Sequence, residues 1–411
     1  MNSYNVKIET QNVLFVSCLL YLACPLLGLL ILLTFILSRI NNKDKKFIYL
    51  FFFLLSLYLG LINSSKIPVT DQLMYYEAYS MVPQRNILEN LMGIYGDREL
   101  TPKEMGFGLL NLIGYYITMG NYPLFITLFT VLLYMLYFDA IYKWFYYIQV
   151  QQPICYIISA ILILAFFTQF FNITIHLQRQ MLATAVVVHA IVQTIIRDKV
   201  AWPSVILSFT LHTSVGIFLP LFIFYRYIKK LSLVKILLVV GIFIFLMAGL
   251  STLATFLISV IGGVDVYALN RLEGMNNAGR EEAMPIAVVM LISIPLTLIS
   301  LKNIHFVNKY KIRSNEIVLY VFYFFLISFS IFNPNNTMQY RYFMMSYGFI
   351  PFIIPLFFRK LNQLELLYLL VLPVFLILCF YFTFESIPFS YAPLEIILFG
   401  NIYSLFNYNL I

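Results

Sequence analysis

The sequence has 411 residues, of which 62% are hydrophobic and only 11% are charged. Soluble domains carry about 25% charged residues, so the composition excludes an ordinary soluble protein. The net charge of +8 does not indicate nucleic-acid binding, because Lys and Arg stand in short clusters beside apolar runs, as membrane orientation requires. Continuous apolar runs also exclude a β-barrel. We therefore predict an all-α polytopic membrane protein.

Apolar runs long enough to cross a bilayer as a helix recur along the whole chain. We predict about eleven spans in a single integral membrane domain, 1–411. The predicted spans are 13–38, 47–62, 122–142, 154–172, 180–196, 233–261, 285–301, 316–332, 342–358, 364–384 and 394–408. The run 106–119 is too short to span and predicts a re-entrant or interfacial helix. The run 202–230 has basic ends and a polar centre, which favours a broken helical hairpin over a single span.

Short basic loops predict which side of the membrane each connection occupies. The basic stretches expected in the cytoplasm are 38–47, 197–199, 301–313 and 358–360. The stretches expected on the outer side are 63–105, 173–179, 262–284, 333–341 and 385–393. The two larger outer loops, 63–105 and 262–284, are the expected carriers of function, since loops of this length commonly are.

The first outer loop contains "VTDQLMYYEAYSMVPQRN" at 69–86. Asp71, Tyr75 and Tyr79 recur at four-residue spacing, as on one face of a short helix, and Glu77 lies close by. Tyrosines beside carboxylates are typical of sugar binding, because rings stack on pyranose faces and carboxylates accept hydroxyl hydrogen bonds. An ordinary interfacial helix is the alternative. Glu104, just before the run 106–119, would either interact with that helix's dipole or line a cavity.

A further group of polar residues begins with His176, Arg179 and Gln180, whose i, i+3, i+4 spacing would place them on one helix face. An arginine at membrane depth costs about 2.5–3.5 kcal/mol on insertion scales, so Arg179 either anchors a helix end or serves a polar site. His212, followed by Thr213 and Ser214, is either a packed residue or a proton acceptor.

Three more arginines lie in outer loops and could bind phosphate through their guanidinium forks; they are Arg271, Arg280 and Arg341. Ordinary surface charge is the alternative for each. No nucleotide-binding motif, no H-E-x-x-H and no cysteine–histidine metal pattern occurs. The four cysteines lie in apolar runs and suit packing roles. We expect no metal and no cofactor.

Four stretches resemble the EpsG-like and O-antigen-polymerase group of bacterial membrane glycosyltransferases. "DQLMYYEAY" is similar to that group's Asp followed by spaced Tyr, and "KEMGFGLLN" to its Glu-x-Gly stretch. "HLQRQMLATA" resembles its Arg-Gln motif, and "SFTLHTSVGIFLPL" its His-Thr-Ser motif. In that pattern Arg179 matches the motif arginine and His212 the motif histidine, whereas Arg271 and Arg280 match by location only.

The resemblance implies a metal-independent polymerase of surface-polysaccharide repeat units in the bacterial inner membrane, with its active site facing the periplasm. Its substrates would be undecaprenyl-diphosphate-linked oligosaccharides, and its partners membrane lipid, a flippase and a chain-length regulator. Arg179, Arg280 and Arg341 would hold diphosphate, and a base among Asp71, Glu77, Glu104 and His212 would serve the acceptor hydroxyl. A flippase or other transporter, an O-antigen ligase and a structural scaffold are the alternatives.

Overall fold

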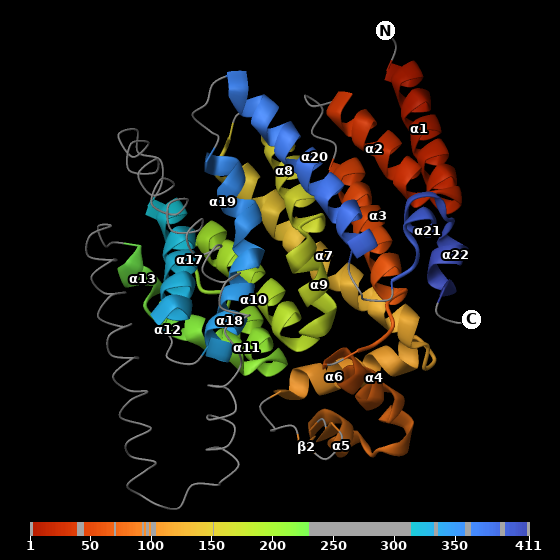
Figure 1. The fold of residues 1–411 in the computed structure, drawn as a ribbon. Helices are drawn as coiled ribbons and strands as arrows, with labels where there is room; N and C mark the ends of the chain where they lie inside the picture. The colour runs from red at the N-terminus through yellow and green to blue at the C-terminus, as the bar shows by residue number, and fades with distance from the viewer. Residues whose placement is uncertain are drawn as a thin grey trace, which may run out of the picture. The chain divides into compact units, whose positions relative to one another are not determined.

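The computed structural model describes residues 3–38, 45–69, 71–92, 94–95, 98–99, 104–150, 152–229, 314–332, 336–357, 363–386 and 391–408. These residues are almost entirely helical (Figure 1). The strands within them are β1 (Ile94–Tyr95) and β2 (Arg98–Glu99), which pair as a minimal antiparallel hairpin. The prediction of an all-α protein is confirmed.

The helices of the N-terminal half are α1 (Ser3–Ala23), α2 (Pro25–Ser38), α3 (Lys45–Ser64), α4 (Asp71–Ser80), α5 (Ile87–Met92), α6 (Met105–Ile117), α7 (Tyr122–Tyr147), α8 (Pro153–Ala165), α9 (Thr168–His176) and α10 (Gln178–Arg197). Those that follow are α11 (Trp202–Leu211), α12 (Leu219–Ile223), α13 (Tyr225–Ile228), α17 (Ser314–Phe332), α18 (Asn336–Ser346), α19 (Ile350–Phe357), α20 (Gln363–Ser386), α21 (Leu394–Phe399) and α22 (Ile402–Phe406). Short 3₁₀ turns are η1 (Val82–Gln84), η3 (Thr213–Phe218) and η5 (Tyr347–Phe349).

The chain divides into two compact units. The first unit consists of Met1–His189, Pro203–Thr213 and Leu361–Ile411, and the second of Ala190–Trp202 and Ser214–Lys360. A single membrane domain over the whole chain therefore stays a prediction. Every contact described below lies within one unit.

The centre of the first unit is the pair α3 and α7, which pack along each other. They approach closely at Gly60, where a Cβ atom would lie 2.8 Å from the backbone oxygen of Thr127. Tyr58 of α3 is fully buried, and its hydroxyl lies 2.9 Å from that of Tyr381 in α20 and 3.0 Å from the carbonyl oxygen of Ile397 in α21. Distant parts of the chain are thus joined by a buried phenol whose polar end is satisfied.

Within the described residues, three helices are long and apolar enough to cross a membrane: α3, α7 and α10. They correspond to the predicted spans 47–62, 122–142 and 180–196. A fourth span results if α8 and α9, which meet at a 58° bend, are counted together, and these cover the predicted span 154–172. At that bend the ring of Phe166 packs edge-on against Phe380 of α20.

Three predicted spans are interrupted in the structure. The run 13–38 forms two helices, because Pro25 cannot donate the hydrogen bond that would continue α1 and starts α2 instead. The run 342–358 is divided by η5, and Gly400 separates α21 from α22 in the run 394–408. In contrast, α17 and α20 occupy the predicted spans 316–332 and 364–384. The predicted spans 233–261 and 285–301 and the loop 262–284 lie outside the described residues.

The described residues of the predicted first outer loop, 63–105, contain short helices. Asn86 and Glu89 form a reciprocal capping box that starts α5, with backbone-to-side-chain distances of 2.9 and 2.8 Å. Gly108 allows α6 to approach α5, since a Cβ atom there would lie 2.5 Å from the carbonyl oxygen of Asn90. In Figure 1, α4, α5 and α6 lie together at one end of the bundle formed by α3, α7, α8 and α20. As predicted, α6 is a short apolar helix of 13 residues.

Candidate functional site

The junction between α9 and α10 carries the residues that the sequence analysis singled out. Leu177 takes a non-helical conformation with φ −118° and ψ 50°, so α9 ends at His176 and a new helix begins at Gln178. The prediction that His176, Arg179 and Gln180 share one helix face is therefore wrong, because the backbone breaks between the first and the other two. Gln180 is buried (3% exposed) within α10.

Arg179 lies at the centre of a polar cluster in the first unit. Its Nη1 forms an ion pair with Oε2 of Glu104, and its Nε lies 3.5 Å from the Tyr75 hydroxyl. The guanidinium carbon also lies 5.5 Å from the centre of the Tyr75 ring, within the range of a cation–π contact. The other carboxylate oxygen of Glu104 lies 3.6 Å from Nε2 of His212. Four candidate residues, from four separate segments, thus meet at one place.

The start of α6 positions Glu104 in this cluster. It occupies the residue before the first turn of α6 but makes no side-chain cap to that helix. Its carboxylate instead forms the ion pair with Arg179, and both roles expected for it from the sequence stay predictions. His212 enters from the break between α11 and η3, where the predicted interruption of the run 202–230 is confirmed.

The close approach of α6 to α11 gives a test of this geometry. A Cβ atom on Gly106 would lie 2.5 Å from Oγ1 of Thr210 and 3.0 Å from its carbonyl carbon. Gly106→Ala is therefore expected to push α6 from α11 and to separate Glu104 from His212. We expect at least a tenfold loss of the catalytic rate, which corresponds to a rise of about 1.4 kcal/mol in the activation free energy. The double variant Gly106→Ala/Thr210→Ala removes the clashing hydroxyl and should recover part of the rate. Activity equal to wild type in the single variant would contradict this packing.

The tyrosines of α4 divide into buried and exposed ones. Tyr75 (5% exposed) packs on Phe107 with ring centroids 5.6 Å apart. Tyr79 is 1% exposed and hydrogen-bonds to Thr118 inside an aromatic cluster, so it is a core residue rather than a sugar platform. Tyr76, in contrast, is 41% exposed. Glu77 is also exposed, and Asp71 is half-buried at the start of α4.

The three remaining candidate arginines lie in other parts of the chain. Arg341 lies in α18, in the second unit. Arg271 and Arg280 fall outside the described residues. Groups of three or more potential metal ligands do not occur in the part of the chain that the structure describes.

The sequence analysis missed a buried cation beside the same helix junction. Lys66, just after α3, is 2% exposed. Its Nζ lies 2.5 Å from Nε2 of His176 and 5.2 Å from the centre of the Tyr391 ring. Burial lowers the pKa of Lys66 from 10.5 to about 8. The sequence signal was a lysine directly after an apolar span, in "NSSKIP", which is unusual on the side expected to be outside.

The lowered pKa of Lys66 predicts that stability depends on pH. Between pH 8 and 10.5 the unfolded chain holds the Lys66 proton and the folded protein has released it, so stability rises with pH across this window. The difference between 10.5 and about 8 corresponds to ~3 kcal/mol. We expect the apparent melting temperature in detergent to rise from pH 8 upward in wild type and to lose this slope in Lys66→Met. Lys45→Met, at the exposed start of α3, should keep the slope.

The cluster around Arg179 combines two chemical functions that a transfer reaction requires: a cation to hold the leaving group and a base to accept a proton. A guanidinium has five N–H donors and can contact a carboxylate and a phosphate oxygen at the same time. Glu104 and His212 together offer a carboxylate beside an imidazole, an arrangement that can accept a proton and stabilise the resulting charge. This site could therefore bind a leaving phosphate and also accept the proton of a nucleophilic hydroxyl.

Comparison with known proteins identifies the family to which this chain belongs. The EpsG family matches this chain over residues 47–396, a stretch that contains all four members of the cluster. No curated protein and no solved structure shows significant similarity to the chain. Since the match covers most of the 411 residues and includes Tyr75, Glu104, Arg179 and His212, the chain belongs to the EpsG family.

Proposed function

We propose that this membrane protein polymerises the repeat units of a bacterial surface polysaccharide at the periplasmic face of the inner membrane. Membership of the EpsG family indicates a polymerase-like role in polysaccharide biosynthesis. The growing glycan would be transferred from undecaprenyl diphosphate to the non-reducing sugar of a new lipid-linked unit. The observation that carries the proposal is the contact of Arg179 with Glu104, beside His212 and Tyr75.

The reaction is a displacement at the anomeric carbon of the donor. The acceptor hydroxyl oxygen forms the new glycosidic bond, the bond to the diphosphate breaks, and its electron pair leaves with the lipid diphosphate. Arg179 holds the diphosphate and stabilises the charge that develops on it. His212 takes the hydroxyl proton, and Glu104 stabilises the imidazolium that results.

Tyr76 and the exposed side of α4 supply the sugar-binding surface in this proposal. Tyr76 is 41% exposed and its ring centroid lies 5.0 Å from that of Tyr122, so the ring is held in place while one face stays accessible. Glu77, next in sequence and also exposed, provides a carboxylate for sugar hydroxyls. Tyr79 and Gln180 serve packing in this account because both are buried.

Deletion of the gene, followed by gel analysis of the surface polysaccharide, tests the proposal. A single repeat unit on the lipid carrier or core supports a polymerase. Complete loss of surface sugar would indicate a flippase, and long polymer left unattached would indicate a ligase; either result would overturn the proposal. Purified protein given lipid-linked repeat units in detergent should form a ladder of longer products without nucleotide sugars.

A further inference from the structure

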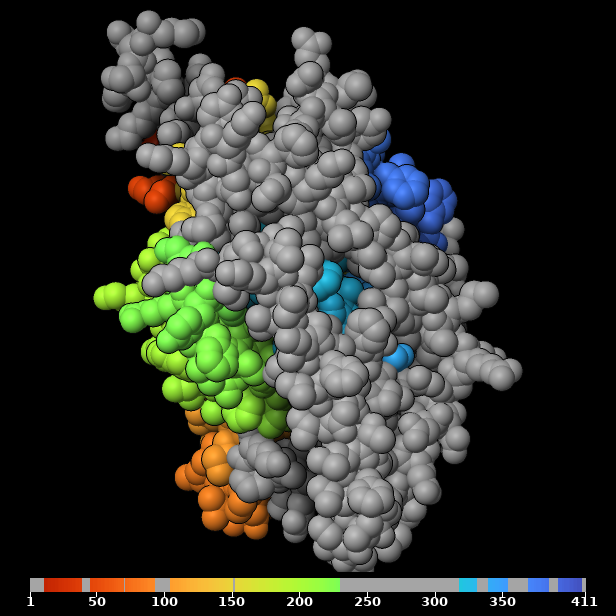
Figure 2. All heavy atoms as spheres, turned by 90° about the vertical axis from the view of Figure 1, so that its left-hand side faces the viewer, coloured from red at the N-terminus to blue at the C-terminus, as the bar shows by residue number. Residues whose placement is uncertain are grey.

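A cavity in the second unit shares no lining residue with the cluster around Arg179. It has a volume of about 470 Å³ and is lined by Asp198, Lys199, Val200, Trp202, Phe222, Ile223, Tyr225 and Arg226. Figure 2 shows side chains from this part of the chain, in green, at the surface of the protein. The cavity is formed where α10 ends and the chain returns through α12 and α13.

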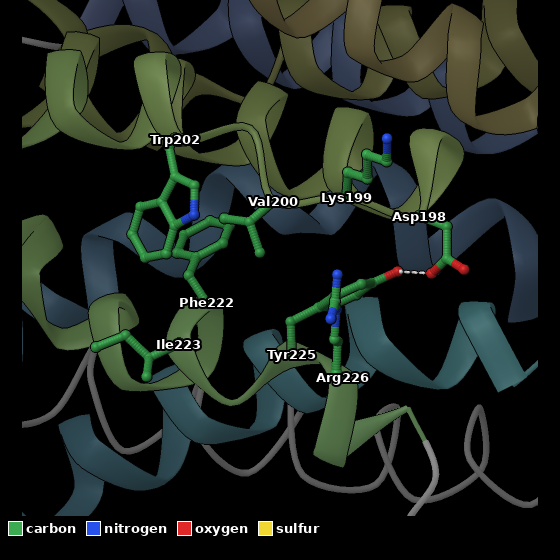
Figure 3. Close-up of a pocket in the computed structure, with 8 residues that line it drawn as sticks. All are labelled: Asp198, Lys199, Val200, Trp202, Phe222, Ile223, Tyr225 and Arg226. Atoms are coloured by element: carbon green, nitrogen blue, oxygen red, sulfur yellow. Dashed lines mark hydrogen bonds between the residues drawn. The ribbon is translucent and has the colours of Figure 1, made fainter.

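The lining of this cavity is amphipathic. Figure 3 shows Trp202, Phe222 and Ile223 on one side, and Tyr225, Arg226 and Asp198 on the other. Trp202 and Ile223 are 41% and 55% exposed, so the apolar side is accessible from outside. An aromatic ring with a polar N–H beside aliphatic groups is typical of the depth at which lipid headgroups meet acyl chains.

The polar side keeps a surplus of positive charge. Asp198 accepts a hydrogen bond from Tyr225 at 3.0 Å and forms an ion pair with Lys229 at 2.8 Å. The Lys229 contact lowers the pKa of Asp198, so its carboxylate stays charged and is neutralised by Lys229. Among the described residues, no carboxylate lies within ion-pair distance of Lys199 or Arg226. The lining therefore contains two cations beyond the one that balances Asp198, although Figure 3 shows the Lys199 ammonium turned away from Arg226.

We propose that this cavity binds an anionic phospholipid, with its phosphate at the Arg226 guanidinium, Lys199 supplying a second positive charge at the rim, and the start of its acyl chains against Trp202 and Ile223. Charge complementarity supports the phosphate, because a guanidinium and an ammonium together suit its oxygens. The accessible apolar side supports a lipid over a free ion, since inorganic phosphate would leave it unused. Basic pockets beside membrane helices bind such headgroups in general. This proposal does not depend on the proposed polymerase activity.

Trp202 provides a direct reporter. The chain has two tryptophans, and the other, Trp144, is fully buried. The full-length protein would be placed in phosphatidylcholine nanodiscs containing increasing amounts of acyl-brominated phosphatidylglycerol or acyl-brominated phosphatidylcholine. Quenching in Trp202→Phe would be subtracted as the Trp144 background. We expect quenching of Trp202 to saturate at a low fraction of phosphatidylglycerol and to rise only gradually with phosphatidylcholine.

The variant Lys199→Gln/Arg226→Gln should lower the preference for phosphatidylglycerol by about tenfold or more. The matched control is Lys45→Gln/Lys46→Gln, which removes two exposed cations at the start of α3 and should keep the preference. Equal quenching by both lipids, or the same loss in both variants, would overturn the proposal in favour of general membrane charge. Displacement of phosphatidylglycerol by millimolar inorganic phosphate would overturn the lipid assignment in favour of a free-phosphate site.

Discussion

Arg179→Ala is expected to reduce polymerisation by about 100- to 1,000-fold, the usual loss when a preorganised donor to a developing negative charge is removed. Arg179→Lys should recover little of it, because an ammonium keeps the charge but lacks the fork that contacts Glu104 and a phosphate together. The measurement is the length and amount of the polymer ladder, divided by the amount of folded protein in the membrane.

A structural role for Arg179 must be separated from a role in the reaction. Arg179→Ala leaves the Glu104 carboxylate, 9% exposed, without its ion-pair partner, and breaking a buried pair in this way destabilises a protein by about 3–5 kcal/mol. Arg179→Ala/Glu104→Ala removes both charges, so protein level and melting temperature should recover toward wild type. Polymer should still be absent. Full-length polymer in the double variant would show that the pair serves folding only.

The sequence singled out the four residues of this cluster but could not show which of them touch. Glu104, Arg179 and His212 come from distant segments. The loop-charge rule predicted an outer position for the stretches that contain Glu104 and Arg179, whereas His212 lay in the polar centre of the predicted hairpin 202–230. Their contact depends on the approach of α6 to α11 at Gly106 and on the helix break at Leu177. Neither has a signal in hydropathy, because Leu177 is an ordinary helix-forming residue.

The tyrosines of α4 show a second limit. The four-residue spacing of Asp71, Tyr75 and Tyr79 correctly predicted a short helix, and α4 begins at Asp71. The same pattern placed these tyrosines on an accessible face, yet Tyr79 is 1% exposed and Tyr76 is 41% exposed. In a chain with 31 tyrosines, ring-bearing residues occur on both faces of a helix, so spacing alone does not distinguish the core face from the outer one.

Asp139, in the middle of α7, was also missed, although its sequence gave a signal. Lys143 follows four residues later inside the same apolar run, and an acid four residues before a lysine forms a pair on one helix face. In the structure Asp139 accepts a hydrogen bond from Tyr49 of α3 at 2.7 Å, and it contacts Lys143 at 2.5 Å and His189 of α10 at 2.8 Å. One carboxylate thus joins three helices of the first unit.

Asp139→Leu should destabilise this unit strongly although it does not touch the candidate site. An acid within an apolar run is tolerated when it has partners, and its removal leaves Lys143 without its counter-charge and His189 without its hydrogen-bond partner. We expect a loss of about 3 kcal/mol, at the lower end for broken buried pairs because the Lys143 side chain is 37% exposed. Tyr49→Phe, which removes one hydrogen bond to the carboxylate, should cost about 1–2 kcal/mol. Reversible unfolding in mixed detergent measures both.

A second variant shows whether the loss of stability in Asp139→Leu comes from unbalanced charge. Asp139→Leu/Lys143→Met/His189→Leu removes all three polar groups and should recover most of the lost stability, because well-packed apolar side chains can replace a buried ionic group without loss. Arg179 and His189 lie ten residues apart on α10, or about 15 Å along its axis. Activity per folded molecule should therefore remain near wild type in the triple variant. A triple variant no more stable than Asp139→Leu would assign the loss to packing instead of charge.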